Sequence, residues 1–165
     1  MVKEYDGKVR VVFKNMVVHP DRVMTAHKAG CAAGKQKKFV EFKNAFWEKG
    51  FKVQKFDEDN IMAIAKDLGL DTAKLKTDMD SPECQAQVNG DMAELAKFHV
   101  NSTPSFFING KALNGALPKE AFKQIIDERL KVAEASGVSG ADYYEKEVIG
   151  KGEKQFRSKM DPKPN

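Results

Sequence analysis

The two cysteines, Cys31 and Cys84, are the residues of this sequence best suited to chemistry. A cysteine thiolate attacks disulfide sulfurs and binds metal ions, so its reactivity depends on the pKa of the thiol. Ser81 is predicted to cap a helix, which places Cys84 in a first turn, where the positive end of the helix dipole lowers a thiol pKa. The carboxylates of Asp80 and Glu83 oppose that effect. Cys84 is therefore a candidate reactive thiol, although a small half-buried packing residue is the simpler interpretation.

Cys31 is a second candidate thiol, in a run of small residues, Ala29–Gly34, that predicts close helix packing. His27 precedes it by four residues, a spacing that suits two metal ligands on one helix face. A zinc site needs further ligands, and the sequence offers no second pair, so no metal is predicted. Because the sequence does not give the distance between Cys31 and Cys84, it leaves two states open: separate thiols or a disulfide.

Ser102, Thr103 and Pro104 form the other candidate site. An X-Pro bond is the only peptide bond that adopts the cis form at low cost, and such a bond presents backbone groups in an unusual direction. Taken alone, Thr103-Pro104 is more simply an ordinary proline at the start of a strand. The surrounding string, Val-Asn-Ser-Thr-Pro-Ser-Phe-Phe-Ile-Asn-Gly-Lys over residues 100–111, is the most specific in the chain.

The elements that would position these residues follow from apolar spacing and turn signals. A strand is predicted over Lys8–Lys14, and a helical pattern follows over Asp21–His99. Asp21, Asp57 or Asp59, Asp71 and Ser81 are the expected helix caps. The helix over Gln36–Lys49 carries Phe39, Phe42 and Phe46 at helical spacing, with Val40 and Trp47 expected to widen the apolar stripe.

The pattern changes after residue 99. Pro104–Ile108 is predicted to form a strand, Asn109-Gly110 a tight turn and Lys111–Leu113 the returning strand. Pro118 is expected to begin a helix, and Ala141–Ile149 is expected to form a last short helix. The sequence from residue 150 onward is polar, basic and expected to fray.

The string over residues 100–111, with Leu113-Asn-Gly-Ala after it, resembles the cis-proline loop and hairpin of DsbA-like thioredoxin-fold thiol–disulfide oxidoreductases. Residues 8–15 resemble the second strand of that family, and residues 34–42 resemble the start of a helix in its inserted helical domain. The resemblance runs from about residue 3 to about residue 135. It implies an α/β thioredoxin-like fold with a core over 1–20 and 100–135, an inserted all-helical subdomain over 21–99, and a C-terminal helix and basic tail over 136–165.

The resemblance also implies protein disulfide exchange with protein or peptide thiols and disulfides. Thr103, Pro104 and Ser102 would contact the substrate, with the Thr103 backbone hydrogen-bonding an extended peptide. The family usually has glycine where Ser102 stands. Its catalytic Cys-x-x-Cys motif is absent and is expected upstream of Met1, so the chain is expected to be N-terminally truncated, without catalytic residues of its own and inactive as a dithiol oxidase.

The family's first strand is also expected upstream, and its absence would leave two neighbouring strands with unpaired edges. A homodimer or a strand-swapped dimer would close that gap. A second hypothesis is therefore a non-catalytic thioredoxin-fold module for peptide binding or dimerisation. The isomerase and glutathione-transferase branch of the fold stays open as a third, although the Phe-Phe-Ile-Asn-Gly string favours the disulfide branch.

Composition sets the remaining limits. The chain has 165 residues, of which 41% are hydrophobic, and this favours one folded globular chain. No apolar run approaches the roughly 20 residues of a membrane span. The net charge of +4 is only mildly basic, so no nucleic-acid partner is predicted, and no cofactor is predicted either. The sequence begins without a signal peptide, and the resemblance implies a periplasmic or other extracytoplasmic location.

Overall fold

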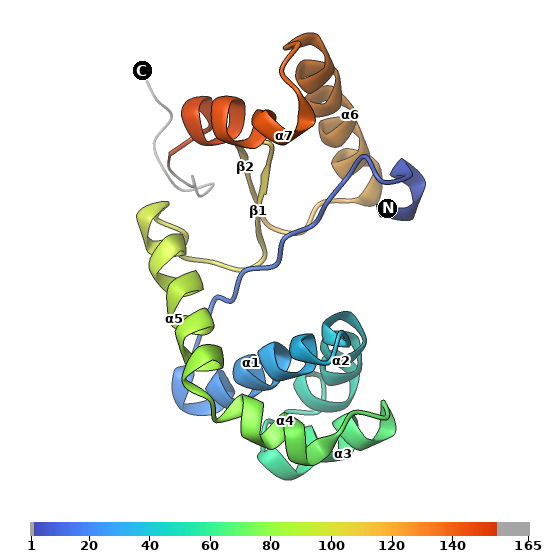
Figure 1. Cartoon of the computed structure of the whole chain (residues 1–165), viewed down its shortest axis with the longest axis vertical. Helices are drawn as coiled ribbons and strands as arrows, with labels where there is room; N and C mark the ends of the chain where they lie inside the picture. The colour runs from blue at the N-terminus through green and yellow to red at the C-terminus, as the bar shows by residue number, and fades with distance from the viewer. Residues whose placement is uncertain (1, 155–165) are drawn as a thin grey trace. The chain divides into compact units, whose positions relative to one another are not determined.

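The computed structural model describes residues 2–154, whose contacts divide them into two units (Figure 1). The helical unit (residues 14–94) contains α1 (Pro20–Lys35), α2 (Phe39–Phe46), a π-helical turn (Trp47–Phe51), α3 (Glu58–Asp67), α4 (Thr72–Met79) and most of α5 (Pro82–Lys97). The hairpin unit (residues 2–13 and 95–154) contains a 3₁₀ turn (Val2–Tyr5), β1 (Ser105–Ile108), β2 (Lys111–Asn114), α6 (Lys119–Ala135), α7 (Gly140–Tyr143) and a π-helical turn (Tyr144–Ile149).

Side-chain caps define where three helices of the helical unit begin. Asp57, Asp71 and Ser81 each accept a hydrogen bond from the backbone N–H three residues later, at 2.9, 2.9 and 3.3 Å. These bonds satisfy N–H groups that a helix start leaves unpaired, and they confirm the predicted caps. The expectation for Asp21 is wrong. His19 occupies the N-cap of α1 with a positive φ of 64° and no side-chain capping bond, and Asp21 lies in the first turn.

The core of the helical unit is built from small residues of α1 packed against larger residues of α2, α3 and α4. Because alanine side chains are short, the neighbouring helices can approach α1 closely. The fully buried members include Ala29, Ala32, Ala33, Phe42, Ile61, Ile64, Ala65, Leu75, Met79 and Cys84.

Val40 and Trp47 lie outside this core, contrary to the expected wide stripe. They are 58% and 52% exposed, whereas Phe42 is 1% exposed. At 100° per helical residue, both point about 140–160° away from Phe42. Phe39 and Phe46 lie within about 60° of Phe42 on the same count and are half-buried. The stripe is therefore narrow, and the outer face of α2 is apolar as well.

The sheet among the described residues is the antiparallel pair of β1 and β2. Ser105 pairs with Asn114 and Ile108 with Lys111, and Asn109-Gly110 forms the turn with positive φ at both residues. That geometry suits the right-handed twist of a hairpin and confirms the predicted strand–turn–strand order. Aromatic edge contacts hold the hairpin to its neighbours: Phe106 with Phe122 of α6 at 4.8 Å, and Phe98 with Phe107 at 5.4 Å between ring centroids.

The prediction of a strand over Lys8–Lys14 is wrong. Residues 9–17 form neither a helix nor a strand, and they are in no ladder of the described chain. A strand exists only where a neighbour exchanges N–H···O bonds with it, and β-type side chains alone do not provide that neighbour. Val11 and Val12 are accordingly 71% and 61% exposed.

The 3₁₀ turn at residues 2–5 is held against α6. The Tyr5 hydroxyl donates to Asp127 Oδ1 at 2.8 Å, and burial together with this carboxylate raises the pKa of Tyr5 to about 12. Lys119 Nζ donates to Glu4 at 2.5 Å, and this bond lowers the pKa of Glu4 to about 2. These contacts fix the start of the hairpin unit.

The final short helix is present as α7 and the turn after it, where Lys151 pairs with Glu147 at 2.8 Å. The end of the predicted basic tail, residues 155–165, lies outside the described residues. Over residues 2–154, no helix has the length and apolar character that crossing a membrane requires.

Candidate functional site

The loop of Ser102, Thr103 and Pro104 leads directly into β1. The Thr103–Pro104 peptide bond is cis, and both residues are exposed, while Ser102 is half-buried. The C=O of Pro104 accepts from the N–H of Gly115 at 2.9 Å, just beyond β2. The Ser105 hydroxyl donates to the C=O of Ser102 at 2.5 Å. The loop is thus tied to the hairpin on both sides of Thr103.

Thr103 itself keeps both backbone groups available. Within residues 2–154, neither its N–H nor its C=O makes a backbone hydrogen bond. The Ser102 hydroxyl oxygen is buried and also lacks a partner in the described part of the chain. A bound peptide strand pairs with an exposed backbone donor and acceptor of this kind. The loop therefore has backbone and side-chain polar groups without a hydrogen-bond partner among residues 2–154.

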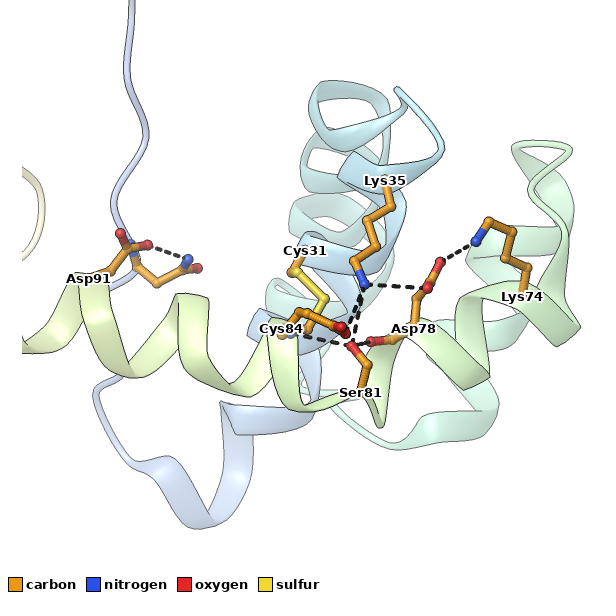
Figure 2. Close-up of a disulfide and its surroundings, with 9 residues drawn as sticks. Cys31, Lys35, Lys74, Asp78, Ser81, Cys84 and Asp91 are labelled. Carbon is orange, nitrogen blue, oxygen red and sulfur yellow. Dashed lines mark hydrogen bonds and ion pairs between the residues drawn. A yellow bond between two sulfur atoms is a disulfide. The ribbon is translucent and has the colours of Figure 1, made fainter.

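Cys31 and Cys84 form one disulfide, which joins α1 to the first turn of α5 (Figure 2). Their Cα atoms are 5.6 Å apart, and the residues are 53 positions apart in the sequence. Cys31 is 7% exposed and Cys84 is fully buried. The two candidate thiols are thus the two halves of one bond, and neither presents a thiolate in this structure. Such a bond cross-links the core of the helical unit.

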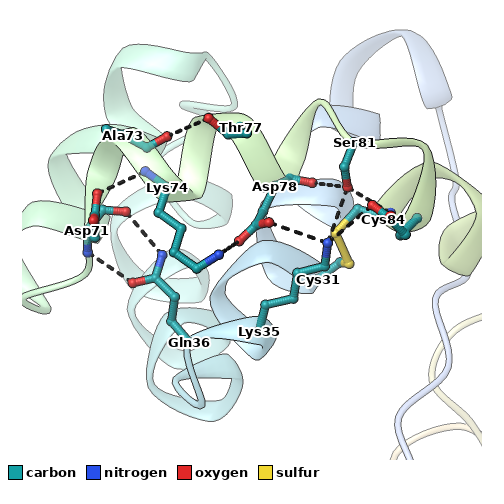
Figure 3. A network of polar contacts seen from close by, with 11 residues as sticks. Cys31, Lys35, Gln36, Asp71, Ala73, Lys74, Thr77, Asp78, Ser81 and Cys84 are labelled. Atoms are coloured by element: carbon teal, nitrogen blue, oxygen red, sulfur yellow. Dashed lines mark hydrogen bonds and ion pairs between the residues drawn. A yellow bond between two sulfur atoms is a disulfide. The ribbon is translucent and has the colours of Figure 1, made fainter.

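A network of charges lies beside the disulfide (Figure 3). Lys35 Nζ lies 3.4 Å from Asp78 Oδ1, from the Ser81 hydroxyl and from Glu83 Oε2. Hydrogen bonds from Lys74 and then Lys35 keep the pKa of Asp78 below its ordinary value. The Ser81 hydroxyl and Lys35 do the same for the pKa of Glu83. Lys35 thus joins the end of α1 to α4 and α5 through ionised groups.

The same network extends to the start of α4. The Gln36 side chain donates to the C=O of Asp71 at 3.1 Å and accepts from its N–H at 3.0 Å (Figure 3). The Asp71 carboxylate caps α4 at the same time. The polar groups around the disulfide therefore bind one another, and their arrangement supports a structural bond more than a reactive one.

Asp91 is the centre of a buried polar cluster that the sequence analysis missed. Its carboxylate, 7% exposed, accepts from the N–H and the side-chain amide of Asn15 at 2.9 and 2.7 Å, and Lys14 Nζ lies 3.2 Å away. His27 Nδ1 lies 2.9 Å from Asn15 Oδ1. Burial lowers the pKa of His27, and the Asp91 charge acts in the opposite direction.

One sequence signal could have revealed this cluster. Cys84, Val88 and Asp91 share one face of α5 at spacings of four and seven residues, so a carboxylate stands in an otherwise apolar stripe. A charge in that position requires a buried partner. His27, considered above for a metal, has Asn15 as its partner, and residues 2–154 contain no group of three or more potential metal ligands.

Comparison with known proteins places this loop and fold in a class. A solved thioredoxin-like oxidoreductase from Silicibacter pomeroyi DSS-3 is 29% identical, with a TM-score of 0.69 over 78% of this chain and 72% of that chain. The fold is therefore thioredoxin-like, mostly helical with a small two-stranded sheet, and of the type found in oxidoreductases. A family model described as thioredoxin matches residues 1–128, and the chain belongs to this thioredoxin family.

A curated relative is a much longer protein, an antiporter. The Na(+)/H(+) antiporter NhaA from Herminiimonas arsenicoxydans is 24% identical over 123 residues. The match covers 74% of this chain and 19% of the antiporter. The chain therefore spans about a fifth of the length of that relative.

Proposed function

We propose that this chain is the peptide-binding part of a DsbA-like thiol–disulfide oxidoreductase that exchanges disulfides with protein or peptide thiols outside the cytoplasm. One observation carries the proposal: Thr103 is exposed beside Pro104, at the start of the hairpin of a thioredoxin-family chain, and its N–H and C=O have no hydrogen-bond partner among residues 2–154. An extended substrate would add its backbone to that of Thr103, while Ser102 and Pro104 shape the loop.

The exchange chemistry requires a dithiol, one thiol to attack the substrate disulfide and a second to resolve the mixed disulfide. The 165 residues contain only Cys31 and Cys84, which are paired and buried. In this proposal the reactive Cys-x-x-Cys lies in sequence outside these residues. The chain alone binds the peptide and does not turn it over.

A location outside the cytoplasm agrees with the Cys31–Cys84 bond. Disulfides persist in oxidising compartments, whereas the cysteines of most cytosolic proteins are kept as reduced thiols. A buried cross-link in the core of the helical unit is of the structural type that such compartments favour. Fractionation of cells that express the native gene, followed by thiol labelling of these two cysteines, tests the location.

Peptide binding at Thr103 is tested with the S-carboxymethylated B chain of insulin, an extended peptide without free thiols. We expect its addition to shift the amide resonances of residues 102–104. Thr103→Arg should weaken binding by roughly 30-fold, because a bulky side chain displaces two backbone hydrogen bonds worth about 1 kcal/mol each.

Thr77→Arg is the matched control, since Thr77 is also exposed but lies on α4 in the helical unit. It should leave the peptide affinity unchanged. Shifts confined to other parts of the hairpin unit, or equal losses in the two variants, would contradict a peptide site at Thr103.

A second candidate is a non-catalytic thioredoxin-fold module for peptide binding or dimerisation. It is favoured by the pairing of both cysteines in one buried bond and by the relative in which the similar region is about a fifth of a membrane antiporter. Light scattering on a sizing column separates the cases. A stable homodimer that Val11→Pro converts to a monomer would support strand pairing through the exposed segment at residues 9–17. A monomer would remove the dimerisation proposal.

A further inference from the structure

One segment of the helical unit carries the net charge of the whole chain. Residues 36–56 contain six lysines and two glutamates, which equals the overall charge of +4. The remaining sequence has equal numbers of basic and acidic residues. The same 21 residues contain the only tryptophan and five of the eleven phenylalanines. Basic and aromatic side chains are therefore concentrated together on α2 and the turn that follows.

The outer face of this segment is apolar and exposed. Val40, Trp47, Phe51 and Val53 are 58%, 52%, 43% and 53% exposed. Val40 and Trp47 are seven residues apart, so they lie on one side of α2 and its π-helical continuation. The Trp47 and Phe51 rings stack with their centroids 4.5 Å apart. We call these four residues the outer apolar face.

Several lysines lie in the same segment as the outer apolar face. Lys43 lies between Val40 and Trp47 along the same side of α2, one helical turn from each. Over residues 2–154, no carboxylate lies within ion-pairing distance of Lys37, Lys43 or Lys55, all of which are exposed. The two other exposed lysines of the segment do form ion pairs, Lys49 with Asp67 and Lys52 with Glu48. Lys37, Lys43 and Lys55 thus lie in the same segment as the four apolar side chains, together with the exposed Glu41.

We propose that the outer apolar face binds the surface of an anionic lipid bilayer, with α2 lying in the plane of the interface. Trp47 and Phe51 would enter the boundary between headgroups and acyl chains, where amphipathic aromatic rings are stable. Lys37, Lys43 and Lys55 would contact the negatively charged headgroups. This surface is on the helical unit and does not depend on the peptide site at Thr103.

Charge and side-chain type favour this occupant over a protein. An interface core between proteins is depleted of lysine, whereas lysines next to exposed aromatic residues match a layer of phosphate headgroups. Four apolar side chains on α2 and the turns after it are also a small area for a stable dimer, but enough for shallow insertion.

Trp47 makes a direct test simple, because its fluorescence is the only tryptophan signal of the chain. The full chain is mixed with phosphatidylcholine vesicles that either contain or lack phosphatidylglycerol. We expect a blue shift of Trp47 emission, protection from acrylamide quenching and flotation with the vesicles, all only where phosphatidylglycerol is present. About 1 M salt should weaken the binding, because the Debye length falls to about 3 Å.

Matched variants separate local contact from net charge. Each lysine near an anionic surface contributes about fivefold to partitioning, so Lys43→Gln with Lys55→Gln should lower it by roughly 30-fold. Lys97→Gln with Lys131→Gln removes the same charge from exposed positions of other helices and should have little effect. Val40→Ser should weaken binding and Val132→Ser, another exposed valine, should not. Circular dichroism establishes that each variant is folded.

Three outcomes would overturn the proposal. The first is an unchanged Trp47 spectrum and no flotation with phosphatidylglycerol vesicles. The second is an equal loss of binding in the two lysine pairs, which would indicate attraction by overall charge. The third is a homodimer that Val40→Ser dissociates, because the outer apolar face would then be covered by a second copy.

Discussion

The two units of this chain are stabilised by different kinds of internal contact. Among the described residues, all but one of the buried apolar side chains belong to the helical unit, where most of them form one core that contains the Cys31–Cys84 disulfide. The hairpin unit has Ile126 as its buried apolar residue among those described, and it relies on paired aromatic rings and surface contacts such as Tyr5 with Asp127.

This difference indicates which part of the chain is self-sufficient. A core of interdigitated side chains stabilises through both burial and packing, whereas half-buried rings and exposed ion pairs contribute much less. The hairpin unit nevertheless carries the loop proposed to bind a peptide. A loop on a lightly packed scaffold can change its conformation at low cost when a partner strand binds.

The sharpest way to break this comparison is to remove one phenylalanine from each unit. Phe42→Ala empties a fully buried position and should cost about 3–5 kcal/mol of unfolding free energy. Phe122→Ala removes a half-buried ring that contacts Phe106 and should cost roughly 1–2 kcal/mol. Denaturant unfolding measures both.

The two units can be followed separately in that experiment. Trp47 reports on the helical unit, and the three tyrosines all lie in the hairpin unit. We expect Phe42→Ala to move mainly the tryptophan transition and Phe122→Ala mainly the tyrosine transition. If the tryptophan and tyrosine transitions always moved together, the two units would unfold as one. The difference in packing would then not give them separate free energies of unfolding.

The disulfide gives the next largest effect. Closing a loop of 53 residues restricts the unfolded chain, so replacing both Cys31 and Cys84 with alanine should cost roughly 4 kcal/mol in the helical unit. The tyrosine transition should stay in place. Peptide binding at Thr103 should also persist, since the proposed site uses neither cysteine. A loss of binding in a folded double variant would instead give the disulfide a role in function.

Much of the helical unit was predictable because its signals are local. Asp57, Asp71 and Ser81 cap helices through residues only three positions away, so composition and spacing are sufficient. The Asn109-Gly110 turn was predictable for the same reason, because its two positive φ values are a property of those residue types.

What the sequence predicted wrongly or left open depends on contacts that are distant in sequence. Lys8–Lys14 has the composition of a strand, but a ladder depends on a second segment. The pairing of Cys31 with Cys84 needs a distance between two helices, which spacing does not provide. The Thr103 loop was found as a string, and its free backbone groups became evident only once the bonds around it were known.

The smallest effect is expected from pH, and it belongs to the cluster around Asp91. Because burial lowers the pKa of His27 in the folded chain, the unfolded chain takes up a proton that the folded chain refuses as the pH falls below about 6.5. The helical unit should therefore lose stability on acidification from about pH 7.5 to about pH 5.5. Asp78 and Glu83, whose pKa values are lowered as well, lose their stabilising charge only at still lower pH.

The tryptophan transition, followed at both pH values, measures this loss. His27→Gln keeps a polar side chain beside Asn15 but cannot be protonated, so its transition should depend less on pH than that of the wild type. His99→Gln, at an exposed position of the hairpin unit, is the matched control and should keep the wild-type dependence. Equal pH dependence in all three proteins would mean that the buried cluster titrates alike in the folded and unfolded chain. The difference between the two units would then rest on packing and the disulfide alone.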